Sequence, residues 1–259
     1  MLEVRNLYKT FNAGTINEKK AINGLSLTLE DGDFVTVIGG NGAGKSTLLN
    51  LVAGVFPVDD GSITIDGQDV TRLPEHKRAK FIGRVFQDPM MGTAATMGIE
   101  ENLALAYRRG QARGLRYGIN NEERKLYREK LAILGLGLED RLTSKVGLLS
   151  GGQRQALTLL MSTLKKPKLL LLDEHTAALD PKTAAKVLEI TETIVRRDKL
   201  TTLMITHNMR DAIAHGNRLI MMDSGRIVAD IRSEEKKNLT VQDLLDKFHV
   251  ESDRMLLSE

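Results

Sequence analysis

Apolar residues recur along this chain with two different periods. Alternating or continuous apolar runs predict strands at 2–7, 21–30, 34–38, 62–65, 82–86, 168–172, 200–206, 218–223 and 226–231. Helical spacing predicts helices at 48–53, over most of 99–138 with an amphipathic segment at 122–134, and at 181–197 and 240–248. Strands that alternate with helices indicate a parallel sheet, and the turn-linked early strands indicate an antiparallel layer beside it.

A glycine-rich stretch lies between a predicted strand and a predicted helix. Its residues are Gly39, Gly40, Asn41, Gly42, Ala43, Gly44, Lys45, Ser46 and Thr47. They match G-x-x-x-x-G-K-[ST], in which backbone N–H groups cradle a polyphosphate, the lysine reaches the outer phosphates and the serine binds Mg²⁺. A plain turn before a core helix would not require this nine-residue match. We therefore predict a nucleoside triphosphate site.

Two adjacent acids follow the apolar run at 168–172. Asp173 and Glu174 lie at the carboxyl end of a predicted strand, where open α/β sheets bind ligands. Because the chain also has a phosphate loop, Asp173 is the candidate Mg²⁺ anchor, and Glu174 is the candidate group that polarises an attacking water. The alternative is that both acids only cap the next helix.

A second anion-binding pattern comprises Ser150, Gly151, Gly152 and Gln153. Ser150 can cap a helix whose first N–H groups lie beside two glycines. Taken alone, a serine before two glycines is most often only a helix cap. Taken with the phosphate loop, it gives one chain two phosphate motifs.

Composition narrows the class of protein. The 259 residues carry 37 basic and 34 acidic side chains, a net charge of +3, which indicates a mixed solvated surface. The chain has no cysteine, so disulfides and thiolate metal sites are excluded. No apolar run approaches the roughly 18 residues of a membrane span, so we expect a cytoplasmic protein. The basic stretch 108–116 is a candidate for binding nucleic acid or anionic lipid, but a flexible basic loop is the preferred interpretation.

These motifs together resemble the ATP-binding subunit of ABC transporters. The resemblance covers nearly the whole chain and includes Gln87, the Leu-Ser-Gly-Gly-Gln signature at 149–153, the segment 178–180 and His207. It implies an α/β P-loop NTPase fold of ABC type, with a parallel-sheet core, an antiparallel β layer and a helical subdomain insertion. The implied division is a core at 1–87 and 168–259 and a helical subdomain at 88–167. ATP and Mg²⁺ are the implied cofactors.

The resemblance also assigns roles to single residues. Phe11 would stack on adenine, with Tyr8 as the competing candidate, and Gln87 would meet the metal or the attacking water. Asp180 would link the sites of two subunits, and His207 would bind the terminal phosphate. Ser46, Gln87 and Asp173 form the implied Mg²⁺ set. Glu174, His207 and Gln87 form the implied catalytic set.

The chain departs from the family pattern at two positions. His175 follows the catalytic glutamate where many members have proline, which predicts a less rigid loop there. Gly40 replaces another common proline and predicts a more flexible phosphate loop. Neither change removes a catalytic group, so a homodimer would have two competent sites.

The resemblance implies an ATPase that works with other chains. Two ATP-binding subunits would face each other, with 150–153 of one closing over the nucleotide of the other. The other partners would be a membrane permease on a separate chain, at the inner face of the membrane, and an extracytoplasmic substrate-binding protein. Import is the favoured direction, and 173–181 resembles a branch linked to amino-acid uptake, with aromatic amino acids as one candidate class.

Three other classes are alternatives. A soluble ATPase of an iron–sulfur assembly scaffold would use the same motifs without a membrane. A DNA-repair ATPase would need long heptads between Lys45 and Asp173, and none are present. A small-molecule kinase would leave the signature at 149–153 without a role.

Overall fold

The computed structural model describes residues 1–111 and 118–247. The chain divides into two compact units, one of Met1–Leu73 with Thr201–Glu259 and the other of Pro74–Leu200. The subdomain boundaries inferred from the family resemblance, at 88 and 167, differ from this division and stay a prediction.

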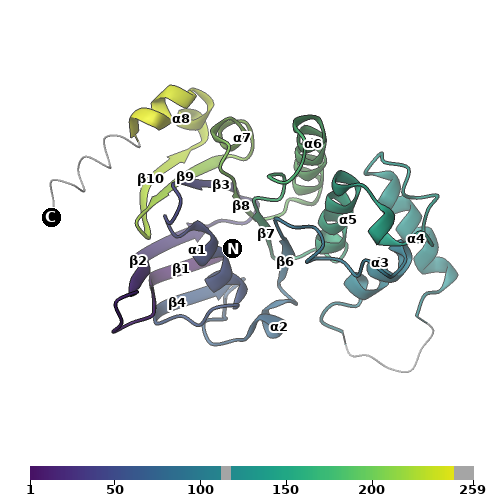
Figure 1. Cartoon of the computed structure of the whole chain (residues 1–259), viewed down its shortest axis with the longest axis horizontal. Coiled ribbons are helices and arrows are strands. Elements are labelled where there is room, and N and C mark those ends of the chain that lie inside the picture. Colours follow the sequence, from purple (N-terminus) through teal and green to yellow (C-terminus); the bar gives the residue numbers. More distant parts are fainter. Residues whose placement is uncertain (112–117, 248–259) are drawn as a thin grey trace. The chain divides into compact units, whose positions relative to one another are not determined.

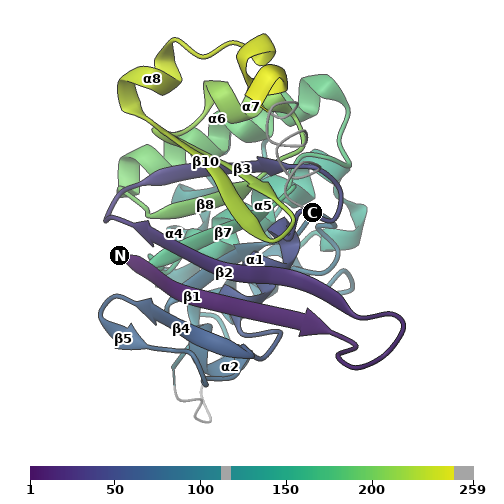
Figure 2. The same ribbon diagram turned by 90° about the vertical axis from the view of Figure 1, so that its left-hand side faces the viewer.

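The first unit contains an antiparallel sheet with the strand order β2-β1-β4-β5. The strands are β1 (Leu2–Phe11), β2 (Lys19–Leu29), β4 (Asp60–Ile65) and β5 (Gln68–Asp69). Alternate side chains are buried, as at Leu25, Leu27 and Leu29, which is the pattern of a sheet with one face on the core. Figure 2 shows β2, β1 and β4 as one layer. The predicted antiparallel layer is confirmed.

The same unit contains parallel strands. β3 (Phe34–Gly39) pairs in parallel with β8 (Thr202–Ile205) on one side and with β9 (Arg218–Asp223) on the other. β10 (Arg226–Arg232) pairs antiparallel with β9, which confirms the predicted hairpin. Helix α1 (Lys45–Ala53) follows β3 and packs against β2 and β3 (Figure 1). β3 therefore carries the phosphate loop from the middle of three parallel strands.

This unit also contains two short helices, α7 (Met209–Ala214) and α8 (Ser233–Lys237). Residues 241–247 are also helical, and the predicted capping box is present, since Thr240 N donates to Asp243 at 2.8 Å and Asp243 N donates to the Thr240 hydroxyl at 3.2 Å. The predicted end of this helix, residue 248, lies outside the described residues.

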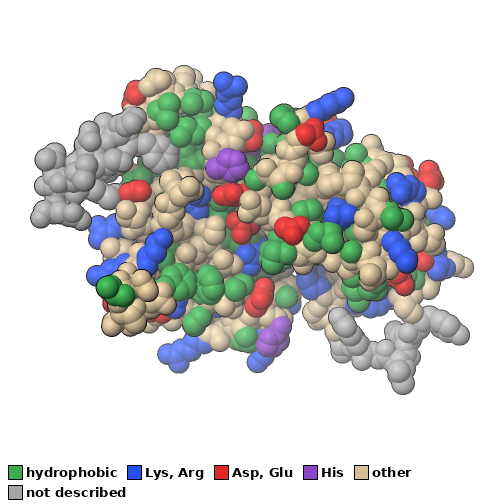
Figure 3. Space-filling model, viewed as in Figure 1, with side chains coloured by type: hydrophobic (Ala, Val, Ile, Leu, Met, Phe, Trp, Pro, Cys, Tyr) green, Lys and Arg blue, Asp and Glu red, His purple; other side chains and the backbone are tan. Residues whose placement is uncertain are grey.

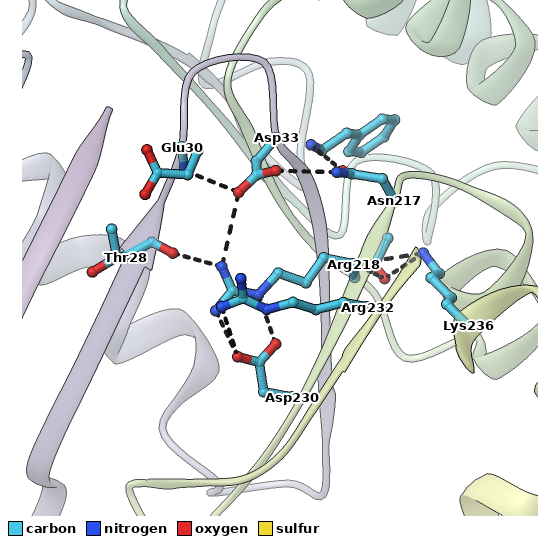
Figure 4. A network of polar contacts seen from close by, with 10 residues as sticks. Thr28, Glu30, Asp33, Asn217, Arg218, Asp230, Arg232 and Lys236 are labelled. Atoms are coloured by element: carbon cyan, nitrogen blue, oxygen red, sulfur yellow. Dashed lines mark hydrogen bonds and ion pairs between the residues drawn. The ribbon is translucent and has the colours of Figure 1, made fainter. Parts of the chain in front are cut away.

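A buried arginine anchors the strand that leads to the phosphate loop (Figure 4). Arg218, 4% exposed, donates two hydrogen bonds to the Asp230 carboxylate at 2.6 and 2.7 Å and one to the Thr28 carbonyl. Asn217 donates to Asp33 at 3.0 Å and accepts from the Phe34 N–H at 2.8 Å. Burial alone would raise the pKa of Asp230, but its hydrogen bonds with Arg218 and Arg232 outweigh this effect and lower the pKa. The start of β3 is therefore fixed by a charged network.

Lys236 holds the short helix α8 in place. Its ammonium group is buried and donates to the Gly216 carbonyl and the Thr36 hydroxyl, each at 3.3 Å, and to the His215 carbonyl. Burial lowers the pKa of Lys236 to about 8. α8 packs against β9 and β10, and the polar contacts of Lys236 link it to Thr36 of β3 (Figure 4).

The second unit combines two parallel strands with helices. β6 (Ile82–Val85) pairs in parallel with β7 (Leu169–Asp173). The described helices are α2 (Glu75–Arg78), α3 (Ile99–Tyr107), α4 (Asn121–Ala132), the 3₁₀ turn η1 (Val146–Leu148), α5 (Gly151–Thr163) and α6 (Pro181–Asp198). Within the described residues, the predicted helical region at 99–138 contains the helices α3 and α4.

The described part of the basic stretch has a structural role. Arg108 donates to Glu123 at 2.8 Å, and Arg109 donates to the carbonyls of Ser162 and Lys165 at 3.2 and 3.1 Å. Residues 112–117 of this stretch lie outside the described part. Basic and acidic side chains are interspersed on the face in Figure 3. Within the described residues, no helix has both the length and the apolar content to cross a membrane.

Candidate phosphate and nucleotide site

The phosphate loop forms a closed turn between β3 and α1. Ala43 N donates to the Gly40 carbonyl at 3.2 Å, and Leu48 N donates to the Gly44 carbonyl at 2.8 Å. Lys45 is 8% exposed, and its ammonium group donates to the carbonyls of Gly39 and Gly40 at 2.8 and 3.0 Å. The lysine is therefore folded over the loop, at the N-terminus of α1, where backbone N–H groups and the helix dipole favour an anion.

Two loop positions require glycine for steric reasons. A Cβ at Gly39 would lie 2.2 Å from the Met222 carbonyl oxygen, and one at Gly44 would lie 2.5 Å from the Ala21 carbonyl oxygen. Gly44 also has a φ of +97°, in the left-handed region. Gly40 differs, because a Cβ there would meet nothing within 4 Å. The local space therefore does not require glycine at the position where the family often has proline.

The predicted phosphate-sensing histidine lies at the same sheet edge as the phosphate loop. β3 and β8 are parallel and in register from Phe34 with Thr202 to Val37 with Ile205, so their carboxyl ends meet at one edge. Gly39 ends β3, and His207 follows β8 in the turn before α7. Asn208 caps α7 by accepting from the Arg210 N–H at 3.0 Å, which fixes this turn.

The two candidate adenine-stacking residues have different surroundings. Phe11 ends β1 and packs edge-on against Phe56, with ring centroids 5.3 Å apart, while the Lys9 ammonium lies 5.6 Å from its centroid. Tyr8 lies over Gly24 of β2, with its hydroxyl 2.9 Å from the point where a Cβ of Gly24 would be. Phe11 is thus supported from β1 and from the segment after α1, and its stacking role stays a prediction.

The predicted carboxylates and glutamine share an edge of the second unit. β6 and β7 are parallel, with Val85 opposite Leu172, so Asp173 at the end of β7, Glu174 after it and Gln87 after β6 all belong to the carboxyl ends of this strand pair. Arg84 of β6 lies 3.4 Å from the Asp173 carboxylate and 4.6 Å from the Phe86 ring centroid. The sequence offered no signal for this pair, because its members are 89 positions apart.

His175 is part of the packed interior rather than a loose loop position. It is 2% exposed, and its Nε2 lies 3.1 Å from the Thr191 hydroxyl of α6. That hydroxyl donates to the Val187 carbonyl at 2.8 Å, so it accepts from Nε2. Glu174, just before it, has a φ of +44°. A hydrogen bond to α6 therefore holds the segment for which the sequence predicted lower rigidity.

The signature segment begins α5 with a capping box, as Ser150 predicted. Gln153 N donates to the Ser150 hydroxyl at 3.3 Å, and Ser150 N donates to the Gln153 side chain at 3.2 Å. A Cβ at Gly152 would lie 2.1 Å from the Thr183 methyl of α6. Asp180 caps α6 by accepting from the Thr183 N–H at 3.1 Å. Hydrogen bonds from the Thr183 side chain and backbone lower the pKa of Asp180. The structure thus brings the signature next to the Asp180 segment.

The candidate residues therefore form two sets. The first unit holds the phosphate loop, Phe11 and His207, and the second holds Gln87, Asp173, Glu174, Asp180 and 150–153. Gln155 of α5 was missed in the sequence. It is fully buried and donates to the Phe86 carbonyl at 3.1 Å, which ties α5 to the residue before Gln87.

Comparisons with known proteins identify the family of this chain. The family model described as ABC transporter matches residues 22–177. The chain is 47% identical over 248 residues to the tyrosine transport ATP-binding protein of Clostridioides difficile, covering 96% of this chain and 98% of that protein. It is 34% identical to the spermidine/putrescine import ATP-binding protein PotA of Haemophilus ducreyi, covering 96% of this chain but 64% of that protein.

A solved structure shows the same fold. It is a dimeric ATP-binding cassette in a post-hydrolysis state bound to ADP and Pi, with a TM-score of 0.76 and 28% identity, covering 90% of this chain and 98% of the other. The predicted P-loop fold of ABC type is confirmed. The chain therefore belongs to the ABC transporter family and is one of its ATP-binding, ATP-hydrolysing subunits.

Proposed function

We propose that this ATPase energises uptake of an amino acid, with aromatic amino acids as the substrate class. The relative in Clostridioides difficile, whose name assigns it to tyrosine transport, supports this, because the similarity extends over 96% of the chain. The PotA relative is named as an import ATP-binding protein, which supports the direction of transport. The cargo would be bound by other chains, namely a membrane permease and an extracytoplasmic substrate-binding protein.

Each predicted site residue has a role in this proposal. Phe11 stacks on adenine, the loop from Gly39 to Thr47 holds the phosphates, and Lys45 contacts the outer ones. Glu174 orients the attacking water and accepts its proton, and His207 holds the terminal phosphate. Gln87 positions the water. These roles suit phosphoryl transfer to water, which depends on positioning and charge compensation.

The oxygen donors of this set suit Mg²⁺. Ser46 is exposed in the first turn of α1, and the Asp173 carboxylate, 17% exposed, lies at the carboxyl edge of β7. Hydroxyl, carboxylate and amide oxygens are ligands that Mg²⁺ accepts together with phosphates. Ser46, Asp173 and Gln87 would hold the ion, which when bound neutralises phosphate charge.

A second copy of the chain completes the proposed working unit. The solved relative is a dimer, which supports two ATP-binding subunits acting together. In this arrangement Ser150 to Gln153 of one copy close over the nucleotide of the other, and Asp180 links the two sites. The dimer binds the permease at the inner face of the cell membrane.

The observation that supports the catalytic part of the proposal is the parallel pairing of β6 with β7, because Gln87 follows the carboxyl end of one strand and Glu174 follows that of the other. Glu174→Gln tests it, because the amide keeps the shape but accepts no proton. We expect ATP binding to persist, ATP turnover to fall by at least about a hundredfold, and a nucleotide-bound dimer to accumulate.

Glu189→Gln is the matched control, since Glu189 is an exposed acid of α6 that pairs with Lys186 at 3.0 Å. Turnover in Glu174→Gln equal to that of the control would remove Glu174 from the proposed role. The transport proposal is tested separately, by ATP-dependent tyrosine uptake into vesicles that contain the chain with its co-purified membrane protein. Uptake of another solute class, with none of tyrosine, would refute the assignment of cargo.

A further inference from the structure

A lysine outside the phosphate-loop motif lies next to that loop. Lys19 is the first residue of β2 and is directly opposite Phe11 in the register with β1. Directly paired residues of antiparallel strands project to the same face of the sheet. Lys19 and the predicted adenine-stacking residue therefore share a face.

The Lys19 side chain extends toward the phosphate loop. Its ammonium nitrogen lies 3.4 Å from the point where a Cβ at Gly42 would be, and among the described residues other than 41–43 it is the atom nearest to that point. Gly42 is exposed and has a φ of +86°, so its backbone is turned within the anion-binding loop. The Lys19 side chain thus extends from the strand position opposite Phe11 to the middle of the phosphate loop.

The charge of Lys19 is not compensated by an acid in residues 1–111 and 118–247. No ion pair or hydrogen bond of its ammonium group occurs in that part of the chain. The adjacent acid, Glu18, instead accepts a hydrogen bond from the Gly14 N–H at 2.8 Å. An uncompensated cation beside an anion-binding loop attracts phosphate oxygens, and charge-assisted hydrogen bonds of this kind are the stronger ones.

We propose that Lys19 is a second phosphate-binding cation of this site, which contacts the polyphosphate of a nucleoside di- or triphosphate from the side of the base. The proposal rests on the proposed nucleotide site. Lys45 is held by the carbonyls of Gly39 and Gly40 within the loop. Lys19 approaches the same loop from β2, at Gly42, so the two cations do not replace each other.

The test compares three variants of the full chain. Lys19→Ala removes the cation, Lys19→Arg keeps a cation of similar reach, and Lys20→Ala removes the neighbouring charge. Lys20 is also exposed, but it pairs with Thr10 and projects to the opposite face of β2. Titration calorimetry with ATP and ADP gives the Kd values, and displacement of a fluorescent ATP analogue by adenosine gives the affinity for the base and ribose alone.

We expect Lys19→Ala to bind ATP and ADP about five- to tenfold more weakly than wild type, with unchanged affinity for adenosine. The loss should shrink at high salt, because it is electrostatic. Lys19→Arg and Lys20→Ala should bind close to wild type.

The following results would overturn the proposal. If Lys19→Ala and Lys20→Ala have the same Kd for ATP, Lys19 makes no specific contact with the polyphosphate. If Lys19→Ala loses affinity for adenosine to the same extent, Lys19 only supports Phe11. If wild type binds no ATP, or Lys45→Ala binds it like wild type, the nucleotide site itself is wrong. Loss of ATP binding in Lys45→Ala with normal binding in Lys19→Ala would refute only the role of Lys19.

Discussion

The hydrogen bond between His175 and Thr191 predicts how the segment after Glu174 is held. Thr191→Val removes the hydroxyl and keeps the shape of the side chain. In wild type the hydroxyl donates to Val187 at 2.8 Å and accepts from His175 at 3.1 Å. Thr191 is 1% exposed and His175 is 2% exposed, so water does not readily replace the lost partner. The variant leaves the buried imidazole N–H without this acceptor.

The expected cost follows from that burial. A buried polar group left without its partner costs about 1–3 kcal/mol, whereas loss of an exposed hydroxyl costs far less. Thr193→Val is the matched control, because its hydroxyl makes the same bond along α6, to the Glu189 carbonyl at 2.8 Å, but is exposed. We expect Thr191→Val to lower the free energy of unfolding by about 2 kcal/mol and Thr193→Val by less than about 0.5 kcal/mol.

Urea unfolding followed by far-ultraviolet circular dichroism measures both variants, since the chain has no tryptophan. ATP turnover is the second measurement. We expect kcat to fall in Thr191→Val, because Glu174 precedes His175, and the Kd for ATP to stay unchanged, because the phosphate loop belongs to the other unit. Equal stability and turnover in the two valine variants would refute the idea that Thr191 holds this segment.

Two further predictions concern stability. Asp230→Asn should lower the free energy of unfolding at pH 7 by about 1 kcal/mol, because it weakens the contact with Arg218. The folded-state pKa of Asp230 is lowered, so the stabilisation that its carboxylate provides is present above the ordinary value of 3.8 and is lost as the pH falls through the folded pKa. Urea unfolding should therefore show a smaller difference in the free energy of unfolding between wild type and Asp230→Asn at pH 3 than at pH 7. A difference that stays constant would contradict this. Gly152→Ala should lower the free energy of unfolding by about 1–3 kcal/mol through overpacking against the Thr183 methyl. Adding Thr183→Ser, which removes that methyl, should recover most of the stability lost, as measured by thermal unfolding. No recovery would show that this contact is not the cause.

The periodic patterns predict several of the long elements, because these have their own apolar signal, whereas α5 is indicated by its cap at Ser150. β2, α4 and α6 fall close to the predicted ranges. Two short helices have no such signal, since α7 and α8 span six and five residues, less than two turns. α8 is placed by Lys236 through contacts with Thr36 and Gly216, which are distant in sequence. A periodicity argument detects a helix only when its own face is apolar.

The site is predictable only where a motif is continuous in sequence. The phosphate loop and the cap at Ser150 depend on neighbours within a few residues, and both are present. Contacts that join separate motifs gave no signal, such as Arg84 with Asp173 and Lys19 beside Gly42. Both pairs depend on strand register and side-chain reach, which the chain's order alone does not specify.

In the signature segment, the contacts within one chain do not by themselves identify a nucleotide-binding role, which is inferred from the full set of motifs. Ser150 and Gln153 satisfy each other in the capping box, and Gly152 is required by the Thr183 methyl. Each of these residues therefore has a sufficient folding role, and an isolated helix start of this kind would be only a cap. Ser150 and Gly151 nevertheless stay exposed at the N-terminus of α5, where the first N–H groups of a helix attract an anion. The cap fixes the direction of those N–H groups, so the folding role and the proposed role toward a second subunit's nucleotide depend on the same hydrogen bonds.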